Sequence, residues 1–348
     1  MIDLRSDTLT QPDLPMLETI LTAPVGDDGR IDENGRGEDP TVNKLEDLAA
    51  SLTGKEAGLL CCSGSMTNLT ALLTWCRPGD RVLVNNLQHL DKSEKTAFSP
   101  RFGQLQRATY PLDEDFQPDL NVIEDQLKKG GISLLCLENT HNFSGGTCIT
   151  EESLKQIYTL AQQYHVPVHT DGVRIFNAAL HLKTTVARLC QYTDSVDFSL
   201  SKSLAAPIGS LLCGTNAFIR EARDTRKMIG GGMRQAGIIA APGIYALEHN
   251  RGRLQEDHDH CALCASLLQD LNVIVPPNPK AVQTNILLLD VTPTGLSNHE
   301  FCRRAKEQGL LINPILDKFV RMIFYKGITT EDVRAAAQIL HTMDKKYR

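Results

Sequence analysis

The chain has 348 residues, 41% of them hydrophobic, which is enough for one large domain and a smaller one. Its formal net charge is −6 and its basic residues are scattered, which argues against binding to nucleic acid or to an anionic membrane. It has no apolar run of the roughly 18 residues needed to span a bilayer, and its N-terminus is polar from the third residue, so we expect a cytoplasmic protein. The ten cysteines are irregularly spaced and several lie in apolar runs, which favours free thiols in a reducing compartment.

Short apolar runs alternate with amphipathic stretches, a pattern typical of an α/β protein with a mainly parallel sheet. In chain order the sequence predicts strands at 80–85, 133–138, 166–170, 195–200 and 209–213, with a helix at 151–164. Residues 235–271 are predicted to be largely helical, with a kink at 242–243. A strand at 285–290, a helix at 298–308, a strand at 320–325 and a helix at 329–345 follow. We therefore expect a large domain of residues 1–247 and a small C-terminal α/β domain of residues 248–348.

Two polar residues follow predicted strands and suit one kind of chemistry. Lys202 lies between serines just after a strand, where loss of hydration lowers the pKa of an amine toward the neutral form that makes Schiff bases. Asp171 ends another strand, where ligands bind in open α/β sheets, and its carboxylate could pair with a pyridine nitrogen. Taken singly, each has a plainer interpretation, as a solvent-facing lysine and as a turn aspartate.

A third stretch, Ser63-Gly-Ser-Met66, opens an apolar helical pattern with small residues. Such a helix start leaves backbone N–H groups free to bind phosphate, although alone it would be only a helix cap. A phosphate cradle, an acid for a ring nitrogen and a lysine occur together in sites for pyridoxal phosphate (PLP). The three stretches together predict PLP held as a Schiff base on Lys202.

Further motifs carry a resemblance to a known family. They are Asp3-Leu-Arg-Ser-Asp-Thr8, Gly37-Glu-Asp-Pro-Thr41, Ser63–Met66, Glu138-Asn-Thr-His141, Asp171-Gly-Val-Arg174, Ser201-Lys202 and the run Arg226–Gln235. Through these motifs, nearly the whole chain resembles the threonine aldolases, both low-specificity and L-allo-threonine types. The resemblance implies the aspartate-aminotransferase-like fold (PLP fold type I), with a mainly parallel seven-stranded sheet in the large domain and a small C-terminal α/β domain.

The resemblance also implies roles for individual residues. Lys202 would hold PLP and Asp171 would pair with its pyridine nitrogen. His89 would stack over the ring, His141 would lie near the substrate's β-hydroxyl, and either histidine or a water they orient would remove its proton. The phosphate would be bound by the backbone of Gly64, Ser65 and Met66 and by Lys227 and Arg234 of a neighbouring subunit. Arg174 would contact the phenolic oxygen of PLP or nearby substrate. The substrate carboxylate would be bound by Ser6, Arg174 and Arg321.

The implied activity is that of a carbon–carbon lyase. L-Threonine, L-allo-threonine or a related β-hydroxy-α-amino acid would be cleaved to glycine and an aldehyde by a dimer or tetramer with shared active sites. The alternative is a PLP-dependent amino-acid racemase of the alanine type on the same scaffold, with His89 as the second proton donor. We expect no metal site, because the His- and Cys-bearing run Asp257–Cys264 is better explained as one helix with buried thiols.

Three departures from the family's pattern leave the β-substituent and the stereochemical preference open. An insertion occupies residues 29–35, in a loop that approaches the active site in relatives, and Arg36 stands where tyrosine is usual. The stretch after His89, Leu90–Ser93, is polar where aromatic residues are common. Tyr325 replaces a histidine that often follows the C-terminal arginine.

Overall fold

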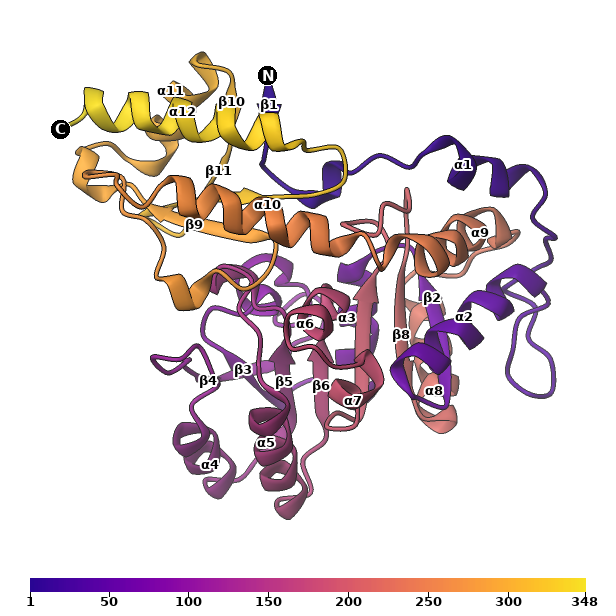
Figure 1. Cartoon of the computed structure of the whole chain (residues 1–348). Coiled ribbons are helices and arrows are strands. Elements are labelled where there is room, and N and C mark those ends of the chain that lie inside the picture. Colours follow the sequence, from indigo (N-terminus) through magenta and orange to yellow (C-terminus); the bar gives the residue numbers. More distant parts are fainter.

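A computed structural model describes all 348 residues of the chain. Its centre is a seven-stranded sheet in the order β2-β8-β7-β6-β5-β3-β4 (Figure 1). The strands are β2 (Ala57–Cys61), β3 (Arg81–Asn85), β4 (Gln106–Tyr110), β5 (Ile132–Glu138), β6 (Val168–Asp171), β7 (Ser195–Ser199) and β8 (Ser210–Gly214). The five strands predicted in this region are confirmed to within two residues, whereas β2 and β4 had not been located individually.

All neighbours in the sheet are parallel except β8, which runs antiparallel to both β2 and β7. A parallel crossover needs a dozen or more residues and usually a helix. The connection from Ser199 to Ser210 is shorter than that, so β8 returns as a neighbouring antiparallel strand. The expected mainly parallel seven-stranded sheet is confirmed.

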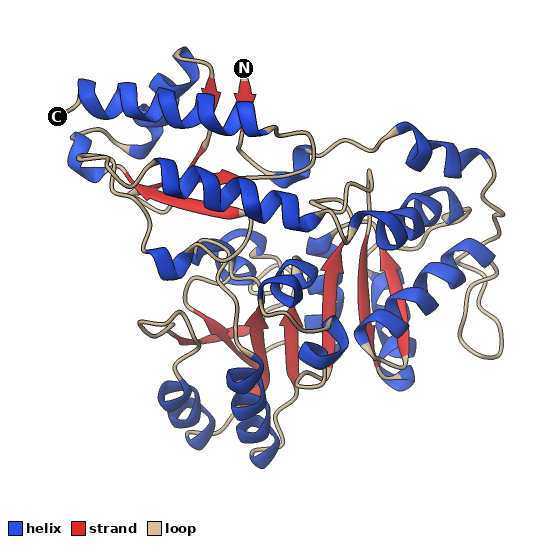
Figure 2. Cartoon of the chain, in the orientation of Figure 1, coloured by secondary structure: helices blue, strands red, loops and turns tan.

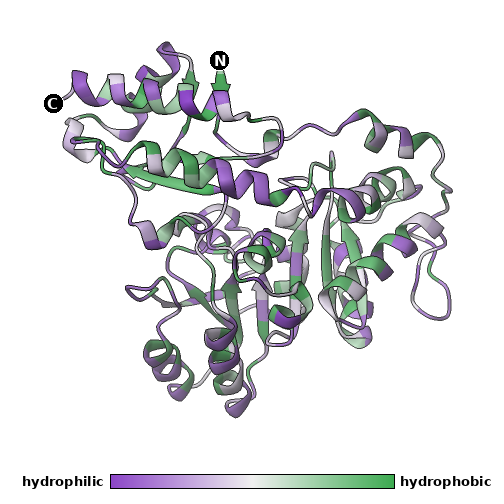
Figure 3. Ribbon diagram, in the orientation of Figure 1, coloured by the Kyte–Doolittle hydropathy of each residue, from purple (hydrophilic) through white to green (hydrophobic).

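Helices cover both faces of the sheet (Figure 2). One face carries α3 (Gly64–Trp75) and α8 (Asn216–Met228), and the other carries α2 (Pro40–Thr53), α4 (Leu120–Lys128), α5 (Glu151–Gln163), α6 (Ile175–His181), α7 (Val186–Cys190) and α9 (Gly237–Tyr245). A hydrophobic core lies on each face of the sheet, and successive residues of β5 point to opposite faces. Leu135 and Leu137 pack in the larger core, and Leu134 and Cys136 pack in the core on the other face. Figure 3 shows the hydrophobic residues concentrated in the central strands.

The C-terminal part has a core of its own. Strands β9 (Ile286–Asp290), β11 (Asn313–Ile315) and β12 (Phe319–Ile323) form an antiparallel sheet in the order β11-β12-β9, packed with α10 (Leu254–Leu267), α11 (Asn298–Glu307) and α12 (Thr330–Lys346). The elements predicted here are confirmed, and the short β10 (Leu310–Leu311) and β11 are additional. Helical structure continues from α9 through a π-helical turn at Ala246–Asn250 toward α10, so the boundary at residue 247 stays a prediction.

The N-terminal segment links the two cores. Strand β1 (Ile2–Asp3) pairs in parallel with β10 of the C-terminal part, and Leu4 lies in the C-terminal core. Asp7 is then buried at the edge of the central sheet, and α1 (Leu14–Leu21) packs against α9. None of the helices combines the length with the apolar composition that a membrane-spanning segment requires.

Candidate active site

The carboxyl ends of the parallel strands face the C-terminal part (Figure 1). The residues at these ends line a cleft. We call it the central cleft, and its volume is about 120 Å³. Residues that follow β3, β5, β6 and β7 line it because parallel strands bring their carboxyl ends to one edge. Its lining residues are Ser6, Thr8, His89, Glu138, Thr140, Asn142, Asp171, Val173, Arg174, Lys202 and Arg321. Six residues expected from the sequence to form the site, namely Ser6, His89, Asp171, Arg174, Lys202 and Arg321, thus line one cleft.

Lys202 lies in the loop that joins β7 to β8. Burial lowers the pKa of its amine, and the nearby Arg174 guanidinium lowers it further, against the opposing charges of Asp7, Asp171 and Asp197. A lowered pKa increases the neutral fraction of the amine, which is the nucleophilic form. The structure therefore gives Lys202 the environment expected of an imine-forming lysine.

Asp171 ends β6 at the floor of the cleft and is fully buried. Asn68 of α3 donates through Nδ2 to its Oδ2 at 3.2 Å, and Asn68 Oδ1 is in turn 3.2 Å from His169 Nε2. Burial raises the pKa of Asp171 to about 7, and the carboxylates of Glu138 and Glu94 contribute to the rise. A cationic N–H group placed beside this carboxylate would relieve the repulsion and keep it ionised.

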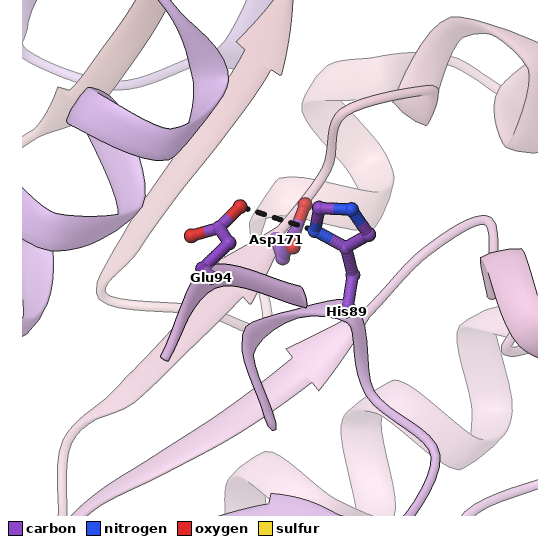
Figure 4. Close-up of side chains that lie close together, drawn as sticks. All are labelled: His89, Glu94 and Asp171. Carbon is purple, nitrogen blue, oxygen red and sulfur yellow. Dashed lines mark hydrogen bonds and ion pairs between the residues drawn. The ribbon is translucent and has the colours of Figure 1, made fainter. Parts of the chain in front are cut away.

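His89 sits beside Asp171 and is held by Glu94 (Figure 4). Its Nδ1 is 3.1 Å from Glu94 Oε1, and its backbone N–H donates to Glu138 Oε2 at 2.8 Å. Burial would lower the pKa of His89, but the Glu94 hydrogen bond and the charges of Asp171 and Glu138 raise it above its ordinary value. Because Glu94 engages Nδ1, Nε2 is the ring atom left for exchanging a proton with a ligand.

The ligand atoms of His89, Glu94 and Asp171 lie within 4.8 Å of one another, close enough in principle to hold a metal ion. Asn68 Nδ2 donates to both carboxylates, at 3.1 Å to Glu94 and 3.2 Å to Asp171.

The His- and Cys-bearing run at 257–264 lies in α10, where Cys261 and Cys264 are buried and His258 Nε2 is 3.1 Å from Asn177 Nδ2.

His141 differs from His89 in position and charge. It is buried behind the cleft wall, and its neighbours Thr140 and Asn142, rather than His141 itself, line the cavity. Its Nε2 is 3.1 Å from Asn85 Oδ1, and its Nδ1 is buried without a hydrogen-bond partner. Burial lowers the pKa of His141 to about 4, so the ring is neutral at pH 7, and donation from Nε2 leaves Nδ1 as the basic atom.

Arg174 makes a contact that the sequence did not reveal. Its Nε and Nη2 donate to the two carboxylate oxygens of Asp7 at 2.7 and 2.8 Å, and both side chains are buried. Burial would raise the pKa of Asp7, but the charges of Arg174, Lys202 and Arg321 bring it down to about 2. We expected Arg174 to contact cofactor or substrate; two of its three guanidinium nitrogens are instead engaged by Asp7, which leaves Nη1.

Arg321 of β12 enters the same cleft from the C-terminal part. Its Nη1 donates to Asn142 Oδ1 at 2.9 Å, its Nε is buried without a partner, and it has no carboxylate within ion-pair distance. Burial and the nearby Arg174 lower the pKa of Arg321 to about 10. A ligand carboxylate would supply the missing counter-charge, so Arg321 is better placed than Arg174 for that role.

The start of α3 offers a phosphate cradle, with one difference from expectation. Ser63 Oγ caps the helix by accepting from Met66 N–H at 3.2 Å, so of the three N–H groups predicted to bind phosphate only those of Gly64 and Ser65 stay free. A Cβ on Gly64 would lie 3.6 Å from Ser210 Oγ, which is buried without a partner, and 3.7 Å from Val173 of the cleft wall. The cradle is therefore next to the central cleft.

Lys227 and Arg234 are the two site residues that the structure does not bring to the cleft of their own chain. Both are exposed, and Arg234 Nη1 pairs with Asp27 at 3.0 Å. Their assignment to a neighbouring subunit stays a prediction.

Residues at all three departures from the family's sequence pattern make contacts outside the central cleft of this chain. Arg36 pairs with Asp47 of α2 at 2.9 Å instead of pointing into the cleft. In the polar stretch after His89, Asp91 is buried and accepts from Arg107 at 2.5 Å. Tyr325 Oη donates to the backbone oxygen of Asp3 at 2.8 Å and so ties β12 to the N-terminal segment.

Four residues that line the cleft or bond to its lining side chains were assigned no role from the sequence. These are Asp7, Asn68, Glu138 and Asn142. Asp7 and Glu138 lie inside motifs that carried the family resemblance, which was a signal that these positions matter. Glu138 accepts from the N–H groups of His89 and Asn142, both at 2.8 Å, and so joins two loops of the cleft.

Comparison with known proteins places the chain in a family. Residues 3–292 match the beta-eliminating lyase family. The low-specificity L-threonine aldolase of Escherichia coli (strain K12) is 38% identical over 345 residues, covering 97% of both chains. The low-specificity L-threonine aldolase 1 of Arabidopsis thaliana is 36% identical over 341 residues, covering 95% of this chain and 93% of that one. A more distant relative, an alanine racemase of Cochliobolus carbonum, is 29% identical over 99% of this chain and 87% of its own.

Among solved structures, the threonine aldolase of Leishmania major superposes with a TM-score of 0.78 at 18% sequence identity, covering 99% of this chain and 100% of that one. At that identity the likeness establishes the fold, which agrees with the expected fold type I architecture. With the match over residues 3–292 and the identity to the aldolases over almost the whole length, the chain belongs to the beta-eliminating lyase family, in its threonine aldolase branch.

Proposed function

We propose that this protein is a PLP-dependent aldolase that cleaves L-threonine, L-allo-threonine or related β-hydroxy-α-amino acids to glycine and an aldehyde. The observation that carries the proposal is the meeting of Lys202, Asp171, His89 and Arg321 in one cleft. Its similarity to low-specificity threonine aldolases over nearly the whole chain supports the same conclusion.

The residues present fit PLP at three points. The free N–H groups of Gly64 and Ser65, beside the unpartnered hydroxyl of Ser210, suit a phosphate. Asp171, whose pKa is raised by burial and by neighbouring carboxylates, suits a protonated pyridine nitrogen, and the amine of Lys202 suits the aldehyde. When bound, PLP supplies an electron sink for the charge left on Cα as the Cα–Cβ bond breaks.

The protein's own residues then orient the substrate and handle its protons. Arg321, aided by Ser6 and the free Nη1 of Arg174, binds the carboxylate and so fixes which bond of Cα breaks. His89 Nε2, with Nδ1 held by Glu94, accepts the β-hydroxyl proton, and neutral His141 offers a second basic atom nearby. Asp7 holds the Arg174 guanidinium beside Lys202, where its positive charge favours the neutral amine and outweighs the opposing charge of Asp7.

Two further features belong to the proposal. We infer a homo-oligomer in which Lys227 and Arg234 reach a neighbour's phosphate, because both are exposed and face no part of their own cleft. We also infer a cytoplasmic location, because all ten cysteines are free thiols.

The test is to incubate the purified protein with PLP and L-threonine or L-allo-threonine and to measure glycine and aldehyde. We expect equimolar products, and loss of both the activity and the visible cofactor absorbance in Lys202→Ala. Exchange of the Cα proton of alanine without aldehyde from any β-hydroxy amino acid would contradict the aldolase and support the racemase.

A further inference from the structure

A second cavity adjoins the central cleft, and it is apolar. We call it the apolar groove and define it by Leu87, Leu112, Phe116, Phe143, Leu288 and Phe319, which dominate its walls. Its volume is about 530 Å³, and it lies between the loops that follow β3, β4 and β5 and the C-terminal sheet. The central cleft, by contrast, is smaller and polar except for Val173. Apolar cavities of such size are typical sites for small organic groups.

Three pairs of residues connect the groove with the cleft. Asn142 lines the cleft and the next residue, Phe143, lines the groove, where its ring centroid is 6.5 Å from that of His89. Leu87 of the groove precedes His89 by two positions. The groove therefore begins beside the histidine that faces the substrate's Cβ in the proposed reaction.

The third connection runs along the C-terminal sheet. Leu288 of β9 is the register partner of Arg321 in β12, so their side chains stand on one face, about 5 Å apart at Cβ. Phe319 lies two residues before Arg321 on that same face, about 7 Å along the strand. The face of the C-terminal sheet that carries Arg321 therefore also carries two residues of the groove wall, Leu288 and Phe319.

Resting on the proposed function, we infer that the apolar groove is the subsite for the substituent on Cβ, and that the preferred substrates carry a large alkyl or aryl group there. On this assignment the methyl of threonine stays within the central cleft, beside His89. A longer group would bury its carbons against Phe143, Leu288 and Phe319.

The test compares kcat/KM for L-threonine with that for 2-amino-3-hydroxyoctanoic acid, whose pentyl group adds four methylenes, and for phenylserine. Each buried methylene should raise kcat/KM about fourfold, so the pentyl compound should exceed threonine on the order of 100-fold. Ala281→Phe fills the groove and Leu288→Asn makes its wall polar. Each should lower kcat/KM for the pentyl compound on the order of 10-fold or more and change that for threonine less than about twofold.

The matched controls place the same changes on exposed positions elsewhere: Ala335→Phe on α12 and Leu21→Asn at the end of α1. Both should keep the wild-type ratio of the two kcat/KM values. A protein that cleaves threonine as efficiently as the pentyl compound would overturn the subsite while leaving the aldolase in place. A preference that neither groove variant alters would also overturn it, because the substituent would then bind elsewhere. Absence of aldehyde from every substrate would instead remove the proposed function itself.

Discussion

Asp7 and Arg174 lie 167 positions apart and form a buried ion pair with two hydrogen bonds. Removing one member of a buried pair leaves the other charge without compensation, which costs about 3–5 kcal/mol. Asp7→Asn should therefore lower the free energy of unfolding by about that much in urea titrations at pH 7. Asp13→Asn is the matched control: the Asp13–Lys326 pair is partly exposed and should contribute less than about 1 kcal/mol.

The same pair predicts a pH dependence. The pKa of Asp7 is lowered to about 2 from its ordinary value of 3.8, so its stabilisation is nearly complete at pH 4 and is lost as pH falls toward 2. The difference in unfolding free energy between wild type and Asp7→Asn should shrink by about 2 kcal/mol across that window. A difference that stays constant from pH 4 to pH 2 would contradict the charged pairing.

Glu94 sets the proton affinity of His89. Glu94→Gln removes the charge of the hydrogen-bond partner, so the pKa of His89 should fall. The limb that His89 contributes to the pH profile of kcat/KM should then move to lower pH. Replacing the histidine itself, in His89→Asn, should reduce kcat by about 10²–10⁴-fold. Asp91→Asn, in the same turn but paired with Arg107, should leave the limb where it is; movement in that control would assign the effect to the loop rather than to Glu94.

For individual residues, the sequence pointed to Lys202, Asp171 and His89 because each follows a strand or lies in a recognisable motif. It missed the Asp7–Arg174 pair and the bridging role of Glu138, because contacts between distant segments leave no local pattern. The expected place of His141 near the β-hydroxyl stays a prediction: the side chain is buried next to the cleft-lining residues Thr140 and Asn142.

At the scale of secondary-structure elements, the first residues of α3 both cap the helix and form the proposed phosphate cradle. Ser63→Ala removes the acceptor for Met66 N–H and should cost about 1 kcal/mol of stability in thermal unfolding. Affinity for PLP should also fall, because the N–H groups of Gly64 and Ser65 lose their fixed direction. Thr215→Ala removes the equivalent cap of α8, which follows the antiparallel strand β8 and so starts at the sheet edge opposite the cleft. It should cost similar stability without weakening PLP binding. Equal PLP affinity in wild type and Ser63→Ala would argue against the cradle.

Most elements were predictable because their periodicity is strong, as in β5 and α12. Edge strand β4 was missed because its sequence, Gln-Arg-Ala-Thr-Tyr, alternates exposed and buried residues and lacks an apolar run. The two-residue β10 depends on pairing with β1, over 300 positions away, which only the folded chain reveals.

For the whole molecule, the central question is whether the sites are shared between subunits. If Arg234 serves a neighbour's cofactor, mixed oligomers of Lys202→Ala and Arg234→Ala subunits contain one intact site per mixed dimer. Random mixing of the two inactive variants should then restore about a quarter of wild-type activity. No recovery, with exchange of subunits verified by mass, would show that Arg234 acts within its own chain or not at all.

The N-terminal segment has a mechanical consequence. Leu4 is fixed to the C-terminal part by hydrogen bonds to Leu311 and Ile323, and only Arg5 and Ser6 separate it from Asp7, the partner of Arg174. The three Cα–Cα steps from Leu4 to Asp7 span at most about 10 Å when fully extended, so the tether has little slack. Any swing of the C-terminal part would pull on the arginine of the cleft. For protein engineering, an affinity tag is therefore better fused after α12 than ahead of β1, where a disturbance of the first strand would travel along the tether to Arg174.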